Sequence, residues 1–119
     1  MSDNTYEQNL RERVGARIRA LRKSKGIDQY IMAKEIGITS GALSQVEAGL
    51  KGLSSPNLAR AAQILHVPVS VLMADVDIDD ATLLDIAKFF ELATTKKGKS
   101  KNYQAIMTLV EDDLKNDQS

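Results

Sequence analysis

Apolar residues recur about every 3.6 positions along most of the chain, which is the spacing of amphipathic helices. The clearest stripe combines Leu10, Val14, Ile18 and Leu21, and Gly26 follows it. Glycine is common directly after a helix, and proline is common in the first turn of one. When glycines and prolines are used as helix boundaries, the apolar pattern predicts seven helices, at residues 6–25, 29–36, 40–48, 56–65, 68–73, 79–94 and 101–115.

Strands are not expected anywhere in the chain. Val67, Val69 and Val71 alternate with other residues, but Pro68 and the shortness of the segment argue against a strand. The predicted fold class is therefore all-α. Residues 6–75 are expected to form a five-helix globule, and residues 76–119 a two-helix tail. The acidic segment "ADVDIDD", residues 74–80, is expected to link the two.

The composition excludes several kinds of chemistry. The 119 residues include no cysteine and one histidine, His66, so disulfides, cysteine-ligated zinc, a cysteine nucleophile and a histidine-based triad are excluded. Asp77, Asp79 and Asp80 lack the glycine and distal glutamate of a calcium loop, and they are interpreted as a helix N-terminus. We expect no enzyme activity, no metal and no cofactor.

The chain shows no candidate for membrane insertion or export. It contains no run of about 18 apolar residues, and its first residues, "MSDNTYEQNL", lack the apolar core of a signal peptide. A cytoplasmic protein without a membrane partner is expected.

The net charge of zero conceals an uneven distribution. Residues 1–75 hold 10 basic and 7 acidic side chains, whereas residues 76–119 hold 6 and 9. The segment "RERVGARIRALRKSK" carries seven basic side chains against one glutamate. A basic face on a neutral protein indicates a local anionic partner, although a solvated helix face remains an equal alternative.

Residues 29–48 carry the most informative spacing. Two short helices that meet at a tight turn must cross closely, which requires a small residue at the crossing and a turn residue that accepts positive φ. Ala33 and Gly37 occupy these two places. Apolar residues occupy the positions that must face inward, namely Met32, Ile36, Ile38, Leu43 and Val46. The joint pattern is typical of a DNA-binding helix-turn-helix.

The segment "RIRALRKSKGIDQYIMAKEIGITSGALSQVEAG" resembles the start of the phage repressor/Cro-type, or XRE-family, DNA-binding domain. The resemblance covers about residues 13–73. It rests on Arg19 and Arg22 in an arginine-rich first helix, and on Asp28 and Gln29, a polar-glutamine pair that opens the second helix. Ala33 and Gly37 match the turn, and Glu47 and Gly49 match the Glu-x-Gly after the third helix. Pro56, Ala62 and Leu65 match the later proline and Ala-x-x-Leu. The resemblance implies a lambda-repressor-like fold that binds double-stranded DNA.

The resemblance also implies roles for single residues. The helix in "ITSGALSQVEAGL" would be the recognition helix, with base contacts from Thr39, Ser40, Gly41, Ala42, Ser44 and Gln45. Phosphate contacts are expected from Gln29, Arg22 and Lys51. Arg22 and Glu47 are expected to form an ion pair that orients the recognition helix. Asp28 departs from the family pattern, and we interpret it as a helix cap only, since a carboxylate repels phosphate.

The tail helices have apolar stripes and are too short to be stable alone in water. We expect them to form a homodimer interface through Leu83, Ile86, Phe90, Ile106, Met107 and Val110. A hairpin packed back on its own globule is the alternative. The predicted function is a transcriptional regulator, a repressor that binds a two-fold operator as a homodimer. An antitoxin-like module, which holds a protein partner through the tail and binds its own promoter, remains the other interpretation.

Overall fold

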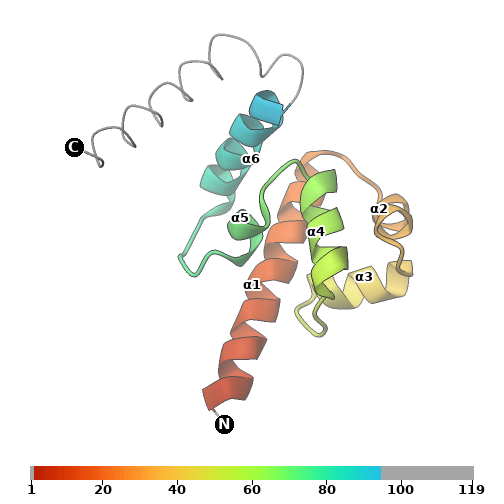
Figure 1. Cartoon of the computed structure of the whole chain (residues 1–119), viewed down its shortest axis with the longest axis vertical. Helices are drawn as coiled ribbons and strands as arrows, with labels where there is room; N and C mark the ends of the chain where they lie inside the picture. Colours follow the sequence, from red (N-terminus) through yellow and green to blue (C-terminus); the bar gives the residue numbers. More distant parts are fainter. Residues whose placement is uncertain (1, 95–119) are drawn as a thin grey trace, which may run out of the picture.

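The computed structural model describes residues 2–94, and these residues form helices connected by short loops (Figure 1). Six helices are present in this part of the chain: α1 Ser2–Ser24, α2 Gln29–Ile36, α3 Ser40–Glu47, α4 Ser55–Ile64, α5 Val69–Met73 and α6 Asp80–Thr94. The described residues contain no strand, so the predicted all-α class is confirmed. The seventh predicted helix, residues 101–115, lies outside the described residues.

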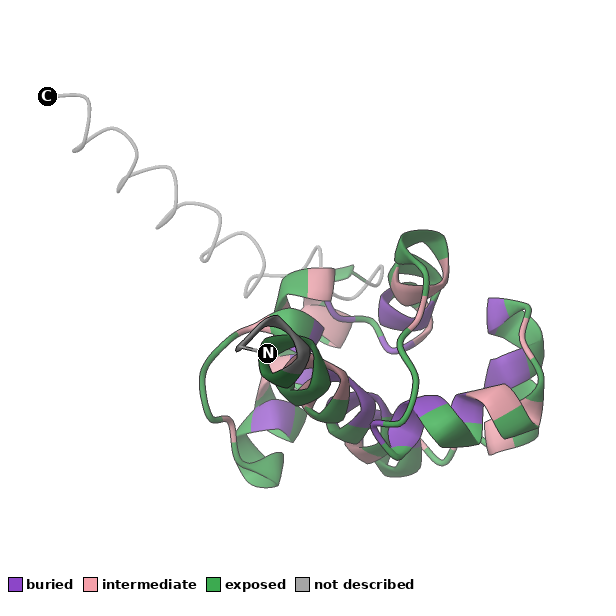
Figure 2. Cartoon of the chain, turned by 90° about the horizontal axis from the view of Figure 1, so that it is seen from below, coloured by how far each residue is buried: buried purple, intermediate pink, exposed green. Residues whose placement is uncertain are grey.

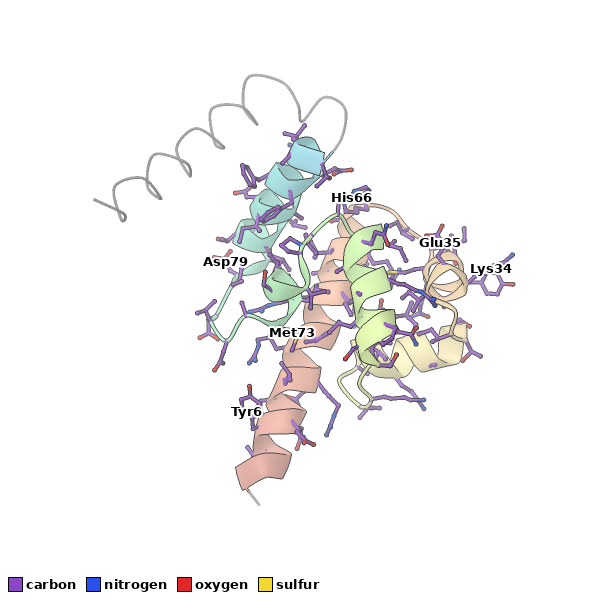
Figure 3. All side chains as sticks on the ribbon, in the orientation of Figure 1. Tyr6, Lys34, Glu35, His66, Met73 and Asp79 are labelled. Atoms are coloured by element: carbon purple, nitrogen blue, oxygen red, sulfur yellow. The ribbon has the colours of Figure 1, made fainter. Side chains whose placement is uncertain are left out.

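Helix α1 is longer than the pattern predicted. It begins at Ser2 instead of residue 6, because its first residues are polar and give no apolar stripe by which to locate the start. Its N-terminal turns extend beyond the other helices, and Tyr6 projects from this extension (Figure 3). Within residues 2–94, neither α1 nor any other helix is both long enough and apolar enough to span a membrane.

Short polar side chains and one glycine set the ends of α2, α3 and α4. The N-cap oxygens of Asp28, Thr39 and Ser54 accept from the backbone N–H groups two or three residues later, at 2.8, 3.0 and 3.3 Å. Gly37 ends α2 in the left-handed region, at φ 97°, and its N–H donates to the Ala33 carbonyl. Each helix therefore begins within one residue of its predicted start.

The core lies where α1 meets the other helices, and the buried residues face inward from each of them (Figure 2). The largest side chains with almost no exposed surface are Ile18, Leu21, Met32, Ile36, Leu43, Leu65, Leu72 and Leu83. Seven of them come from five of the six helices, and Leu65 is the C-cap residue of α4, so a single core joins α1 to the segments that follow it.

Helix α1 approaches α3 with its backbone at Gly15. A Cβ atom at this position would lie 2.0 Å from the Val46 carbonyl oxygen, a distance that no side chain can adopt. Gly49 lies two residues after the end of α3, and a Cβ atom there would lie 2.8 Å from Cγ of Glu12. Its φ of 79° is also in the left-handed region, which favours glycine. Glycine at these two positions therefore permits the close crossing of α1 and α3.

A buried arginine links α1 to the segment around α5. The Arg17 guanidinium donates to the carbonyls of Val71, Leu72, Ala74 and Val76, at 2.5 to 3.4 Å. These carbonyls lie at or beyond the end of a short helix, where backbone acceptors lack helical partners. Burial lowers the pKa of Arg17, and the charge of Arg13 lowers it further, but arginine remains protonated.

Helix α6 packs on α1 through its inner side. Leu83 and Ala87 are buried in the common core, and Lys25 Nζ of α1 lies 3.0 Å from Glu91 Oε2. That ion pair lowers the pKa of Glu91. Helix α6 therefore packs on its own globule, as the alternative interpretation of the tail expected. The division of the chain into two parts at residue 75 stays a prediction.

The predicted homodimer interface is only partly open to a partner. Leu83 was placed there, but it is 1% exposed and packs inside this chain, because it faces α1. Ile86 and Phe90 are half-buried on the flanks of α6. Ile106, Met107 and Val110 lie outside the described residues.

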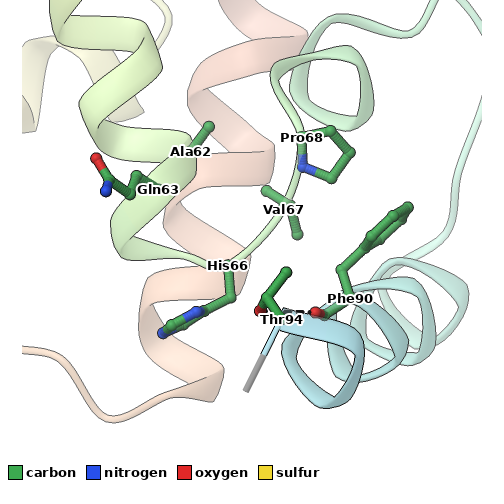
Figure 4. Close-up of a pocket in the computed structure, with 7 residues that line it drawn as sticks. All are labelled: Ala62, Gln63, His66, Val67, Pro68, Phe90 and Thr94. Atoms are coloured by element: carbon green, nitrogen blue, oxygen red, sulfur yellow. Dashed lines mark hydrogen bonds between the residues drawn. The ribbon is translucent and has the colours of Figure 1, made fainter. Parts of the chain in front are cut away.

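An open hollow of about 480 Å³ separates α6 from the turn between α4 and α5 (Figure 4). Phe90 points from α6 toward the turn that carries Val67 and Pro68, while His66 points away from Phe90. His66 has φ 59°, so this turn contains a non-glycine residue in the left-handed region.

We predict that Gly15→Ala lowers the free energy of unfolding by about 2–3 kcal/mol, because the added methyl group must push two helix backbones apart. Gly41→Ala is the matched control. Its Cβ would meet nothing closer than Thr39 Oγ1 at 4.0 Å, so it is expected to raise stability by up to about 1 kcal/mol. Urea denaturation of the full chain measures both, and equal stability of Gly15→Ala and the parent would contradict the backbone contact.

Candidate nucleic-acid interface

The helix-turn-helix consists of α2, the turn at Gly37 and α3. The Gly37 and Ile38 N–H groups both donate to the Ala33 carbonyl at 2.9 Å, which closes the turn. Ala33 is 1% exposed where the two helices cross. Arg60 of α4 donates to the Ile36 carbonyl at 3.1 Å and so supports the end of α2. The turn is therefore fixed on both sides.

Helix α3 buries one side and exposes the other. Leu43 and Val46 are 0% and 2% exposed, whereas Gly41, Ser44 and Gln45 face solvent. Of the other predicted base contacts, Thr39 is exposed, and Ser40 and Ala42 are half-buried. No side-chain hydrogen bond involves Gln45 among the described residues. The six predicted residues thus extend from the N-cap Thr39 to the last turn of α3.

Arg22 and Glu47 form a two-pronged ion pair between α1 and α3. Arg22 Nε lies 2.7 Å from Glu47 Oε2, and Nη2 lies 3.0 Å from Oε1. Both residues are 8% exposed. The hydrogen bonds from Glu47 raise the pKa of Arg22, against the opposing effect of burial. Parallel bonds of this kind fix the relative orientation of the two side chains.

Two further contacts extend this pair. Arg22 Nη1 donates to the Ile27 carbonyl at 2.9 Å, and Gln29 Nε2 donates to Glu47 Oε1 at 3.1 Å. Glu47 therefore connects α1, the first residue of α2 and α3. With its guanidinium so engaged, Arg22 has little surface for a phosphate, and its role as a pairing residue is better supported than its role as a phosphate contact.

A surface hollow of about 200 Å³ lies beside this network. It is lined by four residues of the predicted site, Arg22, Gln29, Ser44 and Glu47, together with Arg19, Lys23 and Ala48. Arg19 and Lys23 are exposed. These two cations are not among the predicted contacts, although their spacing of four residues places them on one side of α1 and could have identified them.

Lys51 lies elsewhere, in the loop after α3. It is exposed and, with Arg11, lines a different cavity. Arg11 and Arg19 lie four residues before and after Gly15, which is about 6 Å in each direction along α1. Cations therefore lie on α1 on both sides of the point where α1 crosses α3.

Comparison with known proteins agrees with this geometry. Residues 18–72, from the second half of α1 to α5, match the helix-turn-helix family model. This segment is therefore similar to helix-turn-helix domains.

Two curated relatives are each 35% identical over 66 residues, which cover 56% of this chain and 48% of the relative. Both are named uncharacterized HTH-type transcriptional regulators, one from Sinorhizobium medicae (strain WSM419) and one from Rhizobium meliloti (strain 1021). The chain spans about half the length of these relatives. No solved structure matches it. In the described part of the chain, no cluster of histidine and acidic side chains could hold a metal ion.

We predict strong coupling between Arg22 and Glu47. Arg22→Met or Glu47→Gln alone should lower the free energy of unfolding by about 3–5 kcal/mol, because each leaves a buried polar partner unsatisfied. The double variant should lose about 2 kcal/mol less than the sum of the two.

The partly exposed pair Lys25–Glu91 is the control for this double-mutant cycle. Its coupling, measured with Lys25→Met and Glu91→Gln, should stay below about 1 kcal/mol because the Glu91 side chain is 45% exposed. Similar coupling energies for the two pairs in urea denaturation would show that the Arg22–Glu47 pair contributes no more than a surface contact.

Proposed function

We propose that this protein is a DNA-binding transcriptional regulator that inserts α3 into the major groove. The supporting observation is the outer side of α3, where Gly41, Ser44 and Gln45 are exposed, small or uncharged. Its orientation is set by the buried Arg22–Glu47 pair. The helix-turn-helix match and the names of the relatives support the same class.

The proposed contacts divide into two kinds. Arg19, Lys23, Gln29 and Lys51 contact phosphates, which supply affinity that falls steeply with salt. The six predicted base contacts face base edges, namely Thr39, Ser40, Gly41, Ala42, Ser44 and Gln45. Of these, Gln45 can form a bidentate pair with adenine. Ser40 and Ser44 can bond several bases, so Gln45 carries the strongest single preference.

We predict that Gln45→Ala relaxes the preference at one base pair by about 1–3 kcal/mol, because it removes a bidentate reader. DNA selected from a random pool supplies the parent preference, and affinities are then compared at one salt concentration. Gln63→Ala, an exposed glutamine on α4, is the control and should leave the preference intact. Lys51→Gln should instead weaken all sequences similarly and reduce the salt slope by about 1. An unchanged preference in Gln45→Ala would remove Gln45 from the readers.

We further propose that the protein acts as a repressor and binds a two-fold operator as a homodimer. The outer side of α6 supports this, since Leu84, Phe89 and Leu92 are 37%, 39% and 48% exposed. The Phe89 ring packs edge-on against Phe90, with centroids 5.1 Å apart, so its position is fixed. Half-sites would lie about 34 Å apart, one turn of DNA.

We predict that Leu84→Glu and Phe89→Glu convert a dimer to a monomer and weaken binding to a two-half-site operator by tenfold or more, because each places a carboxylate in an apolar interface. Sedimentation equilibrium and DNA titration measure the two effects. Lys88→Gln, on the same helix, is the control. A parent protein that is monomeric at micromolar concentration would contradict the homodimer and favour the antitoxin-like alternative.

A further inference from the structure

A small apolar cavity lies between α1, the loop before α4 and the side of α4. Its volume is about 190 Å³, and its apolar lining consists of Leu10, Val14, Val46, Leu53, Leu58 and Met73. Val14 and Val46 are buried at its inner end, and Met73 is 39% exposed (Figure 3). A dry apolar cavity of about 150 Å³ binds benzene, so this one has room for a ring or a chain of about six carbons.

The polar residues that line the cavity are cationic or neutral. They are Arg11, Lys51 and Ser55, with the backbone at Gly52, and no carboxylate lines the cavity. Cγ and Cδ of Arg11 lie 3.7 Å from the Cβ position of Gly52, so the methylene groups of Arg11 run across the loop. A ligand in this cavity would meet two positive side chains at the end of an apolar wall.

Arg11 is incompletely satisfied. Its Nε is buried and has no hydrogen-bond partner among the described residues. Its ion contact in that part of the chain is Glu7 at 3.9 Å, an exposed pair one helical turn away. Lys51 has no ion pair within residues 2–94. The Arg11 side chain is nevertheless 37% exposed, so the outer nitrogens of its guanidinium can donate to an anion at the cavity.

We propose that this cavity binds a small amphipathic anion, a monocarboxylate with an apolar body of about six carbons. The apolar body fills the space beside Val14, Val46 and Leu58. The carboxylate accepts hydrogen bonds from Arg11 and pairs with Lys51. The class follows from the combination of an apolar interior, two cations and a lining without carboxylates.

Anion binding at this cavity is expected to affect DNA binding, because the cavity adjoins α3. This inference rests on the proposed DNA-binding function. Val46 belongs to α3 and precedes Glu47, and Lys51 is a proposed phosphate contact. A carboxylate on Lys51 competes with a phosphate for the same charge, so the bound anion lowers DNA affinity. By linkage, DNA lowers the affinity for the anion by the same factor.

The binding step is tested by titrating the full chain with sodium hexanoate at constant ionic strength, observed by methyl NMR. Saturable shifts are expected at Leu10, Val14, Val46, Leu58 and Met73. Hexan-1-ol should bind about tenfold more weakly, since it lacks the charge, and acetate should give no saturable shift at these methyls. Absence of saturable shifts with hexanoate, or equal binding of hexanoate and hexan-1-ol, would overturn the proposal.

Two variants separate the charge from the cavity. Arg11→Met keeps the chain that crosses Gly52 and should weaken hexanoate about tenfold while leaving hexan-1-ol unchanged. Leu53→Phe reduces the cavity and should weaken both. Lys88→Met, remote on α6, is the control and should change neither. An effect of Lys88→Met equal to that of Arg11→Met would show attraction by net charge alone and overturn the site.

The coupling step is tested with the DNA sequence selected for the parent protein. Hexanoate at saturation should raise the Kd for this DNA at least threefold at constant ionic strength, whereas acetate should not. If the protein binds hexanoate but no DNA, the proposed function fails and the anion site stands. If DNA binds equally well with and without hexanoate, the coupling fails although both sites are real.

Discussion

The backbone contact between α1 and α3 is the constraint on which the rest of the structure depends. Gly15 allows the two helix backbones to touch, because no side chain fits between its Cα and the Val46 carbonyl. Two turns further along α1, Arg22 holds Glu47 at the end of α3. A contact fixes the distance between the helices and a two-pronged ion pair fixes the rotation, so α3 has one position relative to α1. The outer side of α3 is thereby presented as a rigid surface.

The remaining helices support that arrangement from different directions. Helix α2 reaches the same network through Gln29, and α4 reaches the end of α2 through Arg60. Arg17 of α1 holds α5 and the segment beyond it through hydrogen bonds to their carbonyls. Side-chain hydrogen bonds thus join segments that lie far apart in the sequence. The core supplies cohesion, and these bonds supply alignment.

Helix positions were predictable from the sequence because caps and apolar spacing act locally. Asp28, Gly37 and Thr39 set helix ends by bonds to residues within four positions. The contact at Gly15 was not predicted, since helical spacing identifies which side of a helix is buried but not which helix lies against it. For the same reason Leu83 was assigned to a partner chain when it faces α1.

The candidate site was predictable to the extent that it follows from the helix-turn-helix pattern. Residues 39–45 and the Arg22–Glu47 pair could be named from spacing and resemblance. Arg19 and Lys23 could not be predicted as phosphate contacts in this way. They line the same hollow as Gln29, which belongs to another helix, and that proximity appears only in the structure. No sequence pattern predicts the apolar cavity beside Arg11, because its lining residues come from four separate segments of the chain.

The division of labour within α3 has a consequence for how such a protein changes over time. Leu43, Val46 and Glu47 attach the helix to the molecule, whereas the outward side chains of Ser44 and Gln45 contribute little to its attachment. Substitutions at these outward positions therefore leave folding nearly untouched, and surface changes of this kind usually alter stability by less than about 0.5 kcal/mol. Thr39 is the exception, because it also caps the helix. The surface proposed to read DNA can diverge among descendants of this sequence while the scaffold beneath it stays the same.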